Sequence, residues 1–152
     1  MQRKTVRDLA ASDVRGRRVL VRVDFNVPIK NGVIGDDTRI KSSLPTIRYA
    51  LEAGAKCVVL ASHLGRPKGP DPACSLRPTA DRLGKLMHRP VGFLPTLTGP
   101  EALPAVRALG DGQILVLHDL LGIEGTVRPR FVKQYARVGD TIRDAVRQRL
   151  GL

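Results

Sequence analysis

The fold is decided by the stretch RVLVRVDF, residues 18–25. Its apolar residues are mostly β-branched valines, its length suits a single strand, and turn-forming Asn26 and Pro28 follow directly. We therefore expect a buried strand over 18–25.

The next segments predict a helix and a second strand. Apolar residues recur near helical spacing from Asp37 to Ala53, where Asp37 is placed to cap the helix and Gly54 to end it, although Pro45 lies inside. Then comes KCVVLAS, residues 56–62, an apolar run too short for a helix. A loop rich in glycine and proline occupies 63–74.

This alternation continues along the chain. We expect a helix over 75–87, a strand over 91–94, a helix from Pro100 to Gly110 and a strand over 113–117. An amphipathic helical stripe follows over 130–150. Strands that alternate with helices at this spacing form a parallel sheet, so the sequence predicts an α/β, Rossmann-like fold with helices on both faces of the sheet.

Composition is typical of one ordinary globular domain. The 152 residues are 42% hydrophobic and 26% charged, which allows a core without disulfides. Cys57 and Cys74 lack the spacing of a metal site, no signal-peptide pattern occurs, and no apolar run reaches the ~18 residues of a membrane span. We expect a reduced, cytoplasmic protein with no membrane segment.

The formal net charge of +12 indicates a partner that carries phosphate, of either polymeric or small-molecule size. Basic residues are scattered singly apart from Arg15, Arg17 and Arg18, with no interleaved aromatics. This pattern gives little support to nucleic-acid binding.

Polar residues follow the first two predicted strands, at the edge of the sheet where ligands bind in open α/β folds. They are Asp24 and Asn26 after the first strand, His63, Gly65 and Arg66 after the second, and Arg39 at the start of the intervening helix. Guanidinium groups pair with phosphate or carboxylate oxygens, imidazole and amide groups add donors, and glycine lets backbone approach a ligand. The set predicts an anion site for a small polar molecule.

Each of these residues also has a purely structural interpretation. Asp24 suits a loop or cap carboxylate, Asn26 a turn, Arg39 an ion pair with Asp36 or Asp37, and His63 a structural contact. Their joint occurrence behind successive strands makes the functional interpretation about as probable as the structural one. Three further residues, Cys57, His88 and His118, have no partners at metal-ligand spacing and are assigned no role.

Four motifs together resemble the N-terminal domain of phosphoglycerate kinase. They are DFNVP at 24–28, GVIGDDTRI at 32–40, SHLGRPKG at 62–69 and SLRP at 75–78, and the similarity runs in order over about 5–117. The resemblance implies a cytoplasmic glycolytic transferase that moves a phosphoryl group between ATP and 3-phosphoglycerate with Mg²⁺.

The resemblance also implies roles for individual residues. It makes Asp24, Asn26, Arg39, His63 and Arg66 contacts of 3-phosphoglycerate, and it includes Phe25, Leu64 and Gly65 in the same two binding loops. Arg39 would be the catalytic residue, because a guanidinium stabilises charge on a transferring phosphoryl group.

The sequence departs from the family after the last predicted strand. The family has a Leu-Glu-Asn-Leu-Arg-Phe motif there, whereas this chain reads LHDLLG from Leu117 to Gly122, so the arginine of that motif is missing. No nucleotide-binding loop of either common type occurs in the chain. We therefore expect no site for Mg-ATP in this chain and no turnover by the chain alone, unless a nucleotide lobe is supplied in trans.

The end of the sequence has a resemblance of its own. Residues 111–149 are similar to the C-terminus of ketopantoate hydroxymethyltransferase, with none of that family's metal-binding or catalytic carboxylates. We interpret the chain as a partial kinase lobe over 1–117 joined to a tail over 118–152. Two alternatives stay open: a fused ketopantoate hydroxymethyltransferase fragment, and a non-catalytic module that binds phosphometabolites or polyanions.

Overall fold

A four-stranded parallel sheet forms the centre of the computed structural model, which describes residues 6–65, 71–97 and 100–118. The strands lie in the order β1 (Arg18–Arg22), β4 (Cys57–Ser62), β6 (Gln113–His118) and β5 (Val91–Leu94). All six residues of β4 are buried, because this strand has a neighbour on each side and both of its faces are covered. The predicted α/β fold class is confirmed.

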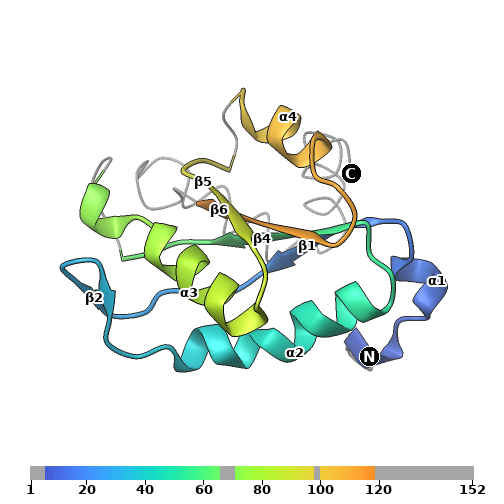
Figure 1. Ribbon diagram of the computed structural model, residues 1–152, viewed down its shortest axis with the longest axis horizontal. Coiled ribbons are helices and arrows are strands. Elements are labelled where there is room, and N and C mark those ends of the chain that lie inside the picture. The colour runs from blue at the N-terminus through green and yellow to red at the C-terminus, as the bar shows by residue number, and fades with distance from the viewer. Residues whose placement is uncertain (1–5, 66–70, 98–99, 119–152) are drawn as a thin grey trace, which may run out of the picture.

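The order of the strands explains why helices cover both faces (Figure 1). Helices α2 (Thr38–Glu52) and α3 (Arg77–Met87) connect β1 to β4 and β4 to β5, both in the same direction across the sheet, whereas α4 (Ala102–Arg107) returns from β5 to β6. Since parallel crossovers are right-handed, a connection that reverses direction crosses the opposite face. Helix α4 accordingly lies across the sheet from α2 and α3.

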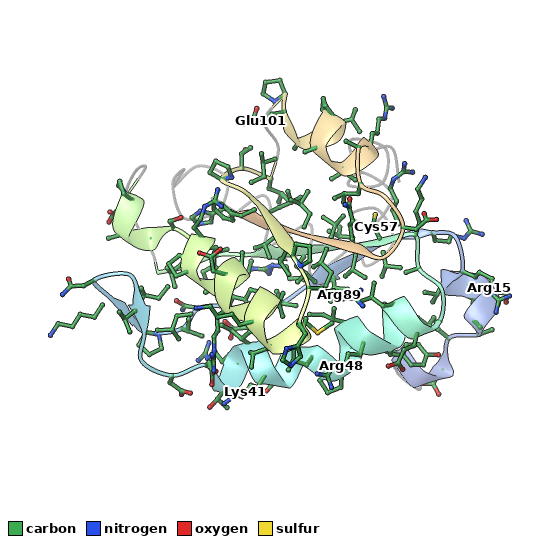
Figure 2. All side chains as sticks on the ribbon, viewed as in Figure 1. Arg15, Lys41, Arg48, Cys57, Arg89 and Glu101 are labelled. Atoms are coloured by element: carbon green, nitrogen blue, oxygen red, sulfur yellow. The ribbon has the colours of Figure 1, made fainter. Side chains whose placement is uncertain are left out.

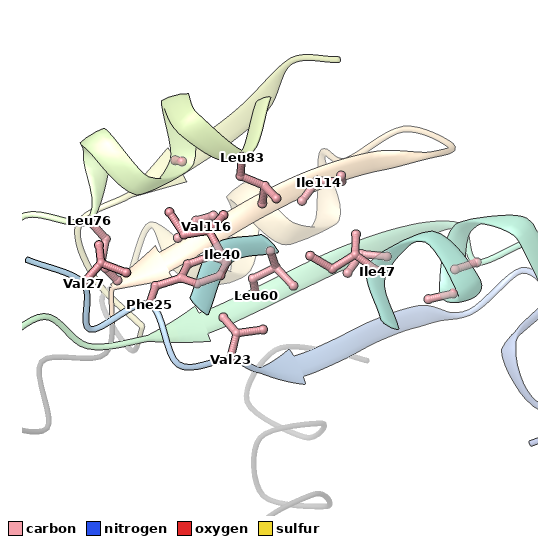
Figure 3. Packing of buried hydrophobic residues seen from close by; sticks show 14 of the residues in the cluster. Val23, Phe25, Val27, Ile40, Ile47, Leu60, Leu76, Leu83, Ile114 and Val116 are labelled. Carbon is pink, nitrogen blue, oxygen red and sulfur yellow. The ribbon is translucent and has the colours of Figure 1, made fainter. Parts of the chain in front are cut away.

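Two apolar clusters hold these layers together. The larger lies between the sheet and helices α2 and α3, where Ile40, Ile47 and Leu83 meet Leu60 and Val116 (Figure 3). The smaller lies under α4, where Val106 packs against Cys57 and Leu117. Cys57 is fully buried, as its position in an apolar run predicted.

Helix α2 begins and ends as expected, but its first turn is held differently. Asp37 occupies the cap position without capping, since its carboxylate binds Lys41 and Arg82 instead. The prediction that Asp37 is the N-cap residue is confirmed in position, although its side chain makes no capping hydrogen bond. Gly54 follows the last turn with φ of +85°, a conformation that favours glycine, and Pro45 lies inside the helix without ending it.

Several short elements escaped prediction. A β-hairpin joins β2 (Ile29–Lys30) to β3 (Val33–Ile34) through a turn at Asn31 and Gly32, both at positive φ. The chain also forms the 3₁₀ turns η1 (Val6–Asp8) and η2 (Pro72–Cys74) and the helix α1 (Ala11–Val14). Each is too short to show a period in sequence.

The predicted boundaries shift by two or more residues at three elements. The first strand ends at Arg22 rather than at residue 25, the helix expected over 75–87 begins at Arg77, and the helix expected up to Gly110 ends at Arg107. The helical stripe predicted over 130–150, like the whole tail over 119–152, lies outside the described residues. In the described part of the chain, no helix combines the length and apolar character that a membrane crossing requires.

Candidate functional site

The two loops singled out in the sequence meet where β1 and β4 end. The strands pair in parallel with Arg22 beside Ala61, and the ladder goes one step further, with Val23 N donating to Ala61 O at 3.0 Å. Past this step the chains separate into two loops, residues 24–26 and residues 63–65. Because parallel strands end at the same edge, both loops lie side by side.

Asp24 pairs with Arg39, which comes from the first turn of α2. The Arg39 Nη1 atom donates to Asp24 Oδ2, and both side chains remain more than half exposed. Partial burial raises the pKa of Asp24. Hydrogen bonds from Arg39 and from Asn26 N, together with the positive charges of Arg39 and His63, lower it by a larger amount, so the pKa of Asp24 lies below its ordinary value. The alternative in which Arg39 pairs with Asp36 or Asp37 is wrong.

Asn26 links the two loops. Its Oδ1 atom accepts a hydrogen bond from Gly65 N at 3.0 Å, and its own backbone N–H donates to Asp24 Oδ1 at 3.0 Å. Gly65 has φ of +64°, and a Cβ there would lie 3.1 Å from the Sγ of Cys74, so backbone and packing both favour glycine. With its oxygen engaged, Asn26 still has Nδ2 as a donor, which has no hydrogen-bond partner among the described residues.

His63 lies against Arg22, the last residue of β1. The distance from Arg22 Nη2 to His63 Nδ1 is 3.4 Å. A guanidinium only donates, so Nδ1 is the acceptor in this contact, and the form of His63 that makes it is the neutral one with its proton on Nε2. The imidazole is then oriented by Arg22 and offers Nε2–H as a donor.

The remaining predicted site residues divide into two groups. Phe25 and Leu64 are 0% and 5% exposed and belong to the large apolar cluster, so neither side chain is available to a ligand. Arg66 lies outside the described residues. The structure thus brings together Asp24, Asn26, Arg39, His63 and Gly65.

Three residues near this edge were missed in the sequence. Arg22 contacts His63, Ser62 accepts a hydrogen bond from Phe25 N at 2.9 Å, and His118 ends β6 in register with Ser62. His118 is buried, and burial followed by the charge of His63 lowers its pKa. The rule that found Asp24 and His63, inspection of each strand end, would also have found His118.

A separate hollow of about 630 Å³ lies between the β2–β3 hairpin and helices α2 and α3. Its charged lining balances three cationic against three acidic side chains: Lys41, Arg82 and Lys85, and Asp36, Asp37 and Asp81. Asp37 already binds both Lys41 and Arg82. This hollow does not include the two loops, and its balanced charge does not favour an anion.

Among the described residues of the loop edge, donors outnumber acceptors. Arg39, His63 and the Asn26 amide group lie near the exposed carboxylate of Asp24, which Arg39 already neutralises. Such an arrangement suits an anionic ligand with several oxygens. It does not suit Mg²⁺, which binds carboxylates and oxygen donors, and the described residues form no cluster of three or more His, Cys, Asp or Glu that could hold a metal ion.

Comparison with known proteins decides the family. The family model described as phosphoglycerate kinase matches residues 6–146 of the 152. The chain belongs to the phosphoglycerate kinase family. The kinase of Fervidobacterium nodosum is 52% identical over 120 residues, and that of Levilactobacillus brevis is 45% identical over 152 residues.

Solved structures agree with this assignment. Phosphoglycerate kinase from Pyrococcus horikoshii superimposes with a TM-score of 0.61 at 35% identity over 68% of this chain, and the enzyme from Coxiella burnetii with 0.61 at 36% over 74%. The chain spans 29% of the F. nodosum kinase and 37% of the L. brevis kinase. It therefore corresponds to a part of a phosphoglycerate kinase.

The family match bears on the predicted tail. It continues to residue 146 and so crosses the region of 111–117 where the sequence predicted a change of family. The resemblance of 111–149 to ketopantoate hydroxymethyltransferase gains no support from the relatives and structures described above, all of which are phosphoglycerate kinases.

Proposed function

We propose that the loop edge beyond β1 and β4 binds 3-phosphoglycerate, as the substrate-binding part of a phosphoglycerate kinase. The observation that supports this proposal most is the convergence of Arg39, Asn26 and His63 from three separate segments on one exposed edge. Each of these side chains is held by a neighbour and retains donor capacity. A ligand with a phosphate and a carboxylate can use several such donors at once.

Arg39 is the proposed catalytic residue within this part. One of its N–H groups is used by Asp24, which orients the guanidinium, and the others have no partner among the described residues. In phosphoryl transfer the protein acts mainly by positioning and by stabilising charge. We infer that Arg39 would orient the substrate and stabilise the transferring group once a nucleotide lobe is present.

Mg-ATP is not assigned to any described residue. The loop edge is rich in donors and poor in the oxygen ligands that Mg²⁺ needs. We therefore propose that the chain alone binds substrate without turnover. A cytoplasmic location is part of this proposal, since the substrate is a glycolytic metabolite.

The proposal is tested by thermal unfolding of the chain with and without 3-phosphoglycerate. A ligand at about one hundred times its dissociation constant stabilises the fold by roughly 2.7 kcal/mol, which is a shift of several degrees for a domain of this size. We expect a cooperative transition that rises with 3-phosphoglycerate, and Arg39→Ala to raise the dissociation constant at least about tenfold, since a hydrogen bond to a charged group contributes about 1.5–3 kcal/mol.

Arg48→Ala is the matched control. Arg48 lies on the same helix as Arg39 and is exposed (Figure 2), so its loss removes an equal charge away from the loop edge. We expect it to leave binding unchanged. Equal losses in Arg39→Ala and Arg48→Ala, with a steep dependence on salt, would instead support the polyanion-binding alternative.

We further propose that residues 1–117 form the substrate-binding lobe and that 118–152, into which the family match continues, contribute an amphipathic helix. The resemblance of 111–149 to ketopantoate hydroxymethyltransferase stays a prediction, and the continuous family match favours a single kinase segment. Amide hydrogen exchange on the full chain tests the helix. Protected amides at a helical period over 130–150 are expected, and uniformly fast exchange there would contradict it.

A further inference from the structure

The hydroxyl of Ser62 lies where β1 and β4 part. The last shared step of their ladder is the bond from Val23 N to Ala61 O. A parallel ladder that continued in the same way would join His63 N to Val23 O and then Phe25 N to His63 O. Instead, Phe25 N donates to Ser62 Oγ at 2.9 Å, and Ser62 Oγ donates to His63 O at 3.3 Å. The Ser62 hydroxyl therefore replaces one backbone hydrogen bond of the ladder and bridges the two strands.

This bridge is enclosed by the core. Ser62 is 0% exposed, and the side chain of Phe25 on the other side of the bond is 0% exposed as well. A buried backbone N–H without a hydrogen-bond partner lowers the stability of the fold, because the group has lost its hydrogen bond to water and has gained none in return. Phe25 N–H thus depends on Ser62 for its hydrogen bond.

The bridge sets the separation between the two loops of the proposed site. On one side, the backbone of Phe25 lies between Asp24 and Asn26, and on the other the bridge ends on His63. One step further along, Gly65 N donates to Asn26 Oδ1 at 3.0 Å. A direct bond from Phe25 to His63 would draw the loops together, whereas loss of the bridge would let them separate.

We propose that Ser62 is a positioning residue: its buried hydroxyl fixes the distance between the loop that carries Asp24 and Asn26 and the loop that carries His63 and Gly65. This inference rests on the proposed function, because it concerns the same site. Ser62 itself is buried and acts through the backbone of its neighbours. If the loops are correctly placed in only a fraction of the molecules, the apparent affinity for the ligand falls in proportion to that fraction.

The test compares Ser62→Ala with Thr79→Val in the full chain. Thr79 is also 0% exposed, and its hydroxyl donates to Leu76 O at 2.6 Å in α3, away from the two loops. Both variants lose one buried hydroxyl, and we expect both to unfold at a lower temperature. Only Ser62→Ala should weaken 3-phosphoglycerate binding, by about tenfold if the correctly placed loops fall to about a tenth of the population.

Conservative replacement separates positioning from stability. Ser62→Thr keeps the hydroxyl and should restore binding close to the unsubstituted chain. Ser62→Cys keeps the approximate size with a poor hydrogen-bonding group and should behave like Ser62→Ala; it replaces Ser62→Ala if that variant does not fold. Binding by Ser62→Ala or Ser62→Cys at the unsubstituted affinity, or an equal loss in Thr79→Val, would overturn the proposal.

Hydrogen exchange at Phe25 N–H keeps the two proposals distinguishable. If the unsubstituted chain does not bind 3-phosphoglycerate, the proposed function has failed, but the bridge still predicts much faster exchange at Phe25 in Ser62→Ala than in Thr79→Val. If the chain binds and exchange at Phe25 is the same in both variants, the bridge has failed and the proposed function stands.

Discussion

The loop edge beyond β1 and β4 and the hollow beside the β2–β3 hairpin are both polar, but they differ in how their charges are matched. In the hollow, the carboxylate of Asp37 binds Lys41 on its own helix and Arg82 on α3, so it ties α2 to α3. At the loop edge, the only carboxylate in an ion pair among the described residues is that of Asp24, which binds Arg39 and also accepts a hydrogen bond from Asn26 N, while Asn26 and His63 keep donors that these contacts do not use.

This difference separates a structural ion cluster from a candidate binding site. The hollow encloses about 630 Å³, yet its cations are matched by carboxylates. The loop edge has an excess of donors. For this reason we propose the loop edge, and not the hollow, as the anion site. The predictions below test this contrast, beginning with the largest expected effect.

Phe25→Ala should cost about 3–5 kcal/mol of stability, the usual loss for a buried aromatic side chain. Phe25 lies within a binding loop, but its ring packs against the core beside Ile40 (Figure 3). Chemical denaturation measures the loss. Phe25→Leu, which retains most of the apolar volume, should cost clearly less. A small effect of Phe25→Ala would mean that the ring belongs to the site and not to the core.

Asp37→Asn should lower the unfolding temperature and leave 3-phosphoglycerate binding unchanged, because it frees Lys41 and Arg82 in the hollow. Asp81→Asn is the control: Asp81 lines the same hollow, and its carboxylate has no ion pair or hydrogen bond with the described residues. Thermal unfolding and a ligand titration measure both properties. Weaker binding in Asp37→Asn, at unchanged unfolding temperature, would place a binding group in the hollow.

Gly32→Ala should destabilise the fold by about 1 kcal/mol, the cost of a left-handed conformation for a residue with Cβ. Gly32 has φ of +75° in the hairpin turn, whereas an added Cβ at Gly35 would make only ordinary contact with Pro28 at 3.8 Å. Gly35→Ala is therefore expected to be nearly neutral. Equal costs in denaturant unfolding would contradict the geometry of the hairpin.

The smallest expected effect concerns acid stability. Hydrogen bonds from Lys41 and then Arg82 lower the pKa of Asp37, and the pKa of Asp24 is lowered as described above. A carboxyl whose folded pKa is lowered stabilises the protein above its unfolded pKa of about 3.9, and this stability is lost as pH falls through the folded value.

Thermal unfolding between pH 5 and lower pH measures this dependence. The unsubstituted chain should lose stability below about pH 4. Asp24→Asn and Asp37→Asn should each reduce that loss, with a small change for Asp24, because its side chain is 60% exposed and solvent screens its ion pair. An unchanged acid dependence in both variants would show that neither ion pair persists in solution.

Most of the fold could be predicted because its longer elements show clear patterns of apolar residues. The apolar runs at 56–62 and 113–117 are strands β4 and β6, and the helical spacing after Asp37 is α2. Asn31 and Gly32 are typical turn residues, but the two strands of the hairpin at 29–34 could not be predicted from periodicity, since each has only two residues. The ends of the longer elements also differ from the predicted ones, because tertiary contacts and not local propensity decide where a strand leaves its neighbour.

The candidate site was predictable in its composition but not in its connections. Asp24, Asn26 and His63 follow strands in the sequence, and a parallel sheet places strand ends together. The pairing of Arg39 with Asp24, across 15 residues, depends on how α2 packs. Ser62 is chemically ordinary in the sequence, and its role depends on the point at which two strands separate.

The measurement that tests the central claim most directly is a titration of the isotope-labelled chain with 3-phosphoglycerate, followed through its backbone and side-chain N–H signals. We predict that signals of Asn26, Arg39 and Gly65 shift with one common saturation curve, while those of Gly32 and Lys85 in the hollow do not move. Shifts confined to the hollow, or no saturable shift at the loop edge, would contradict the account.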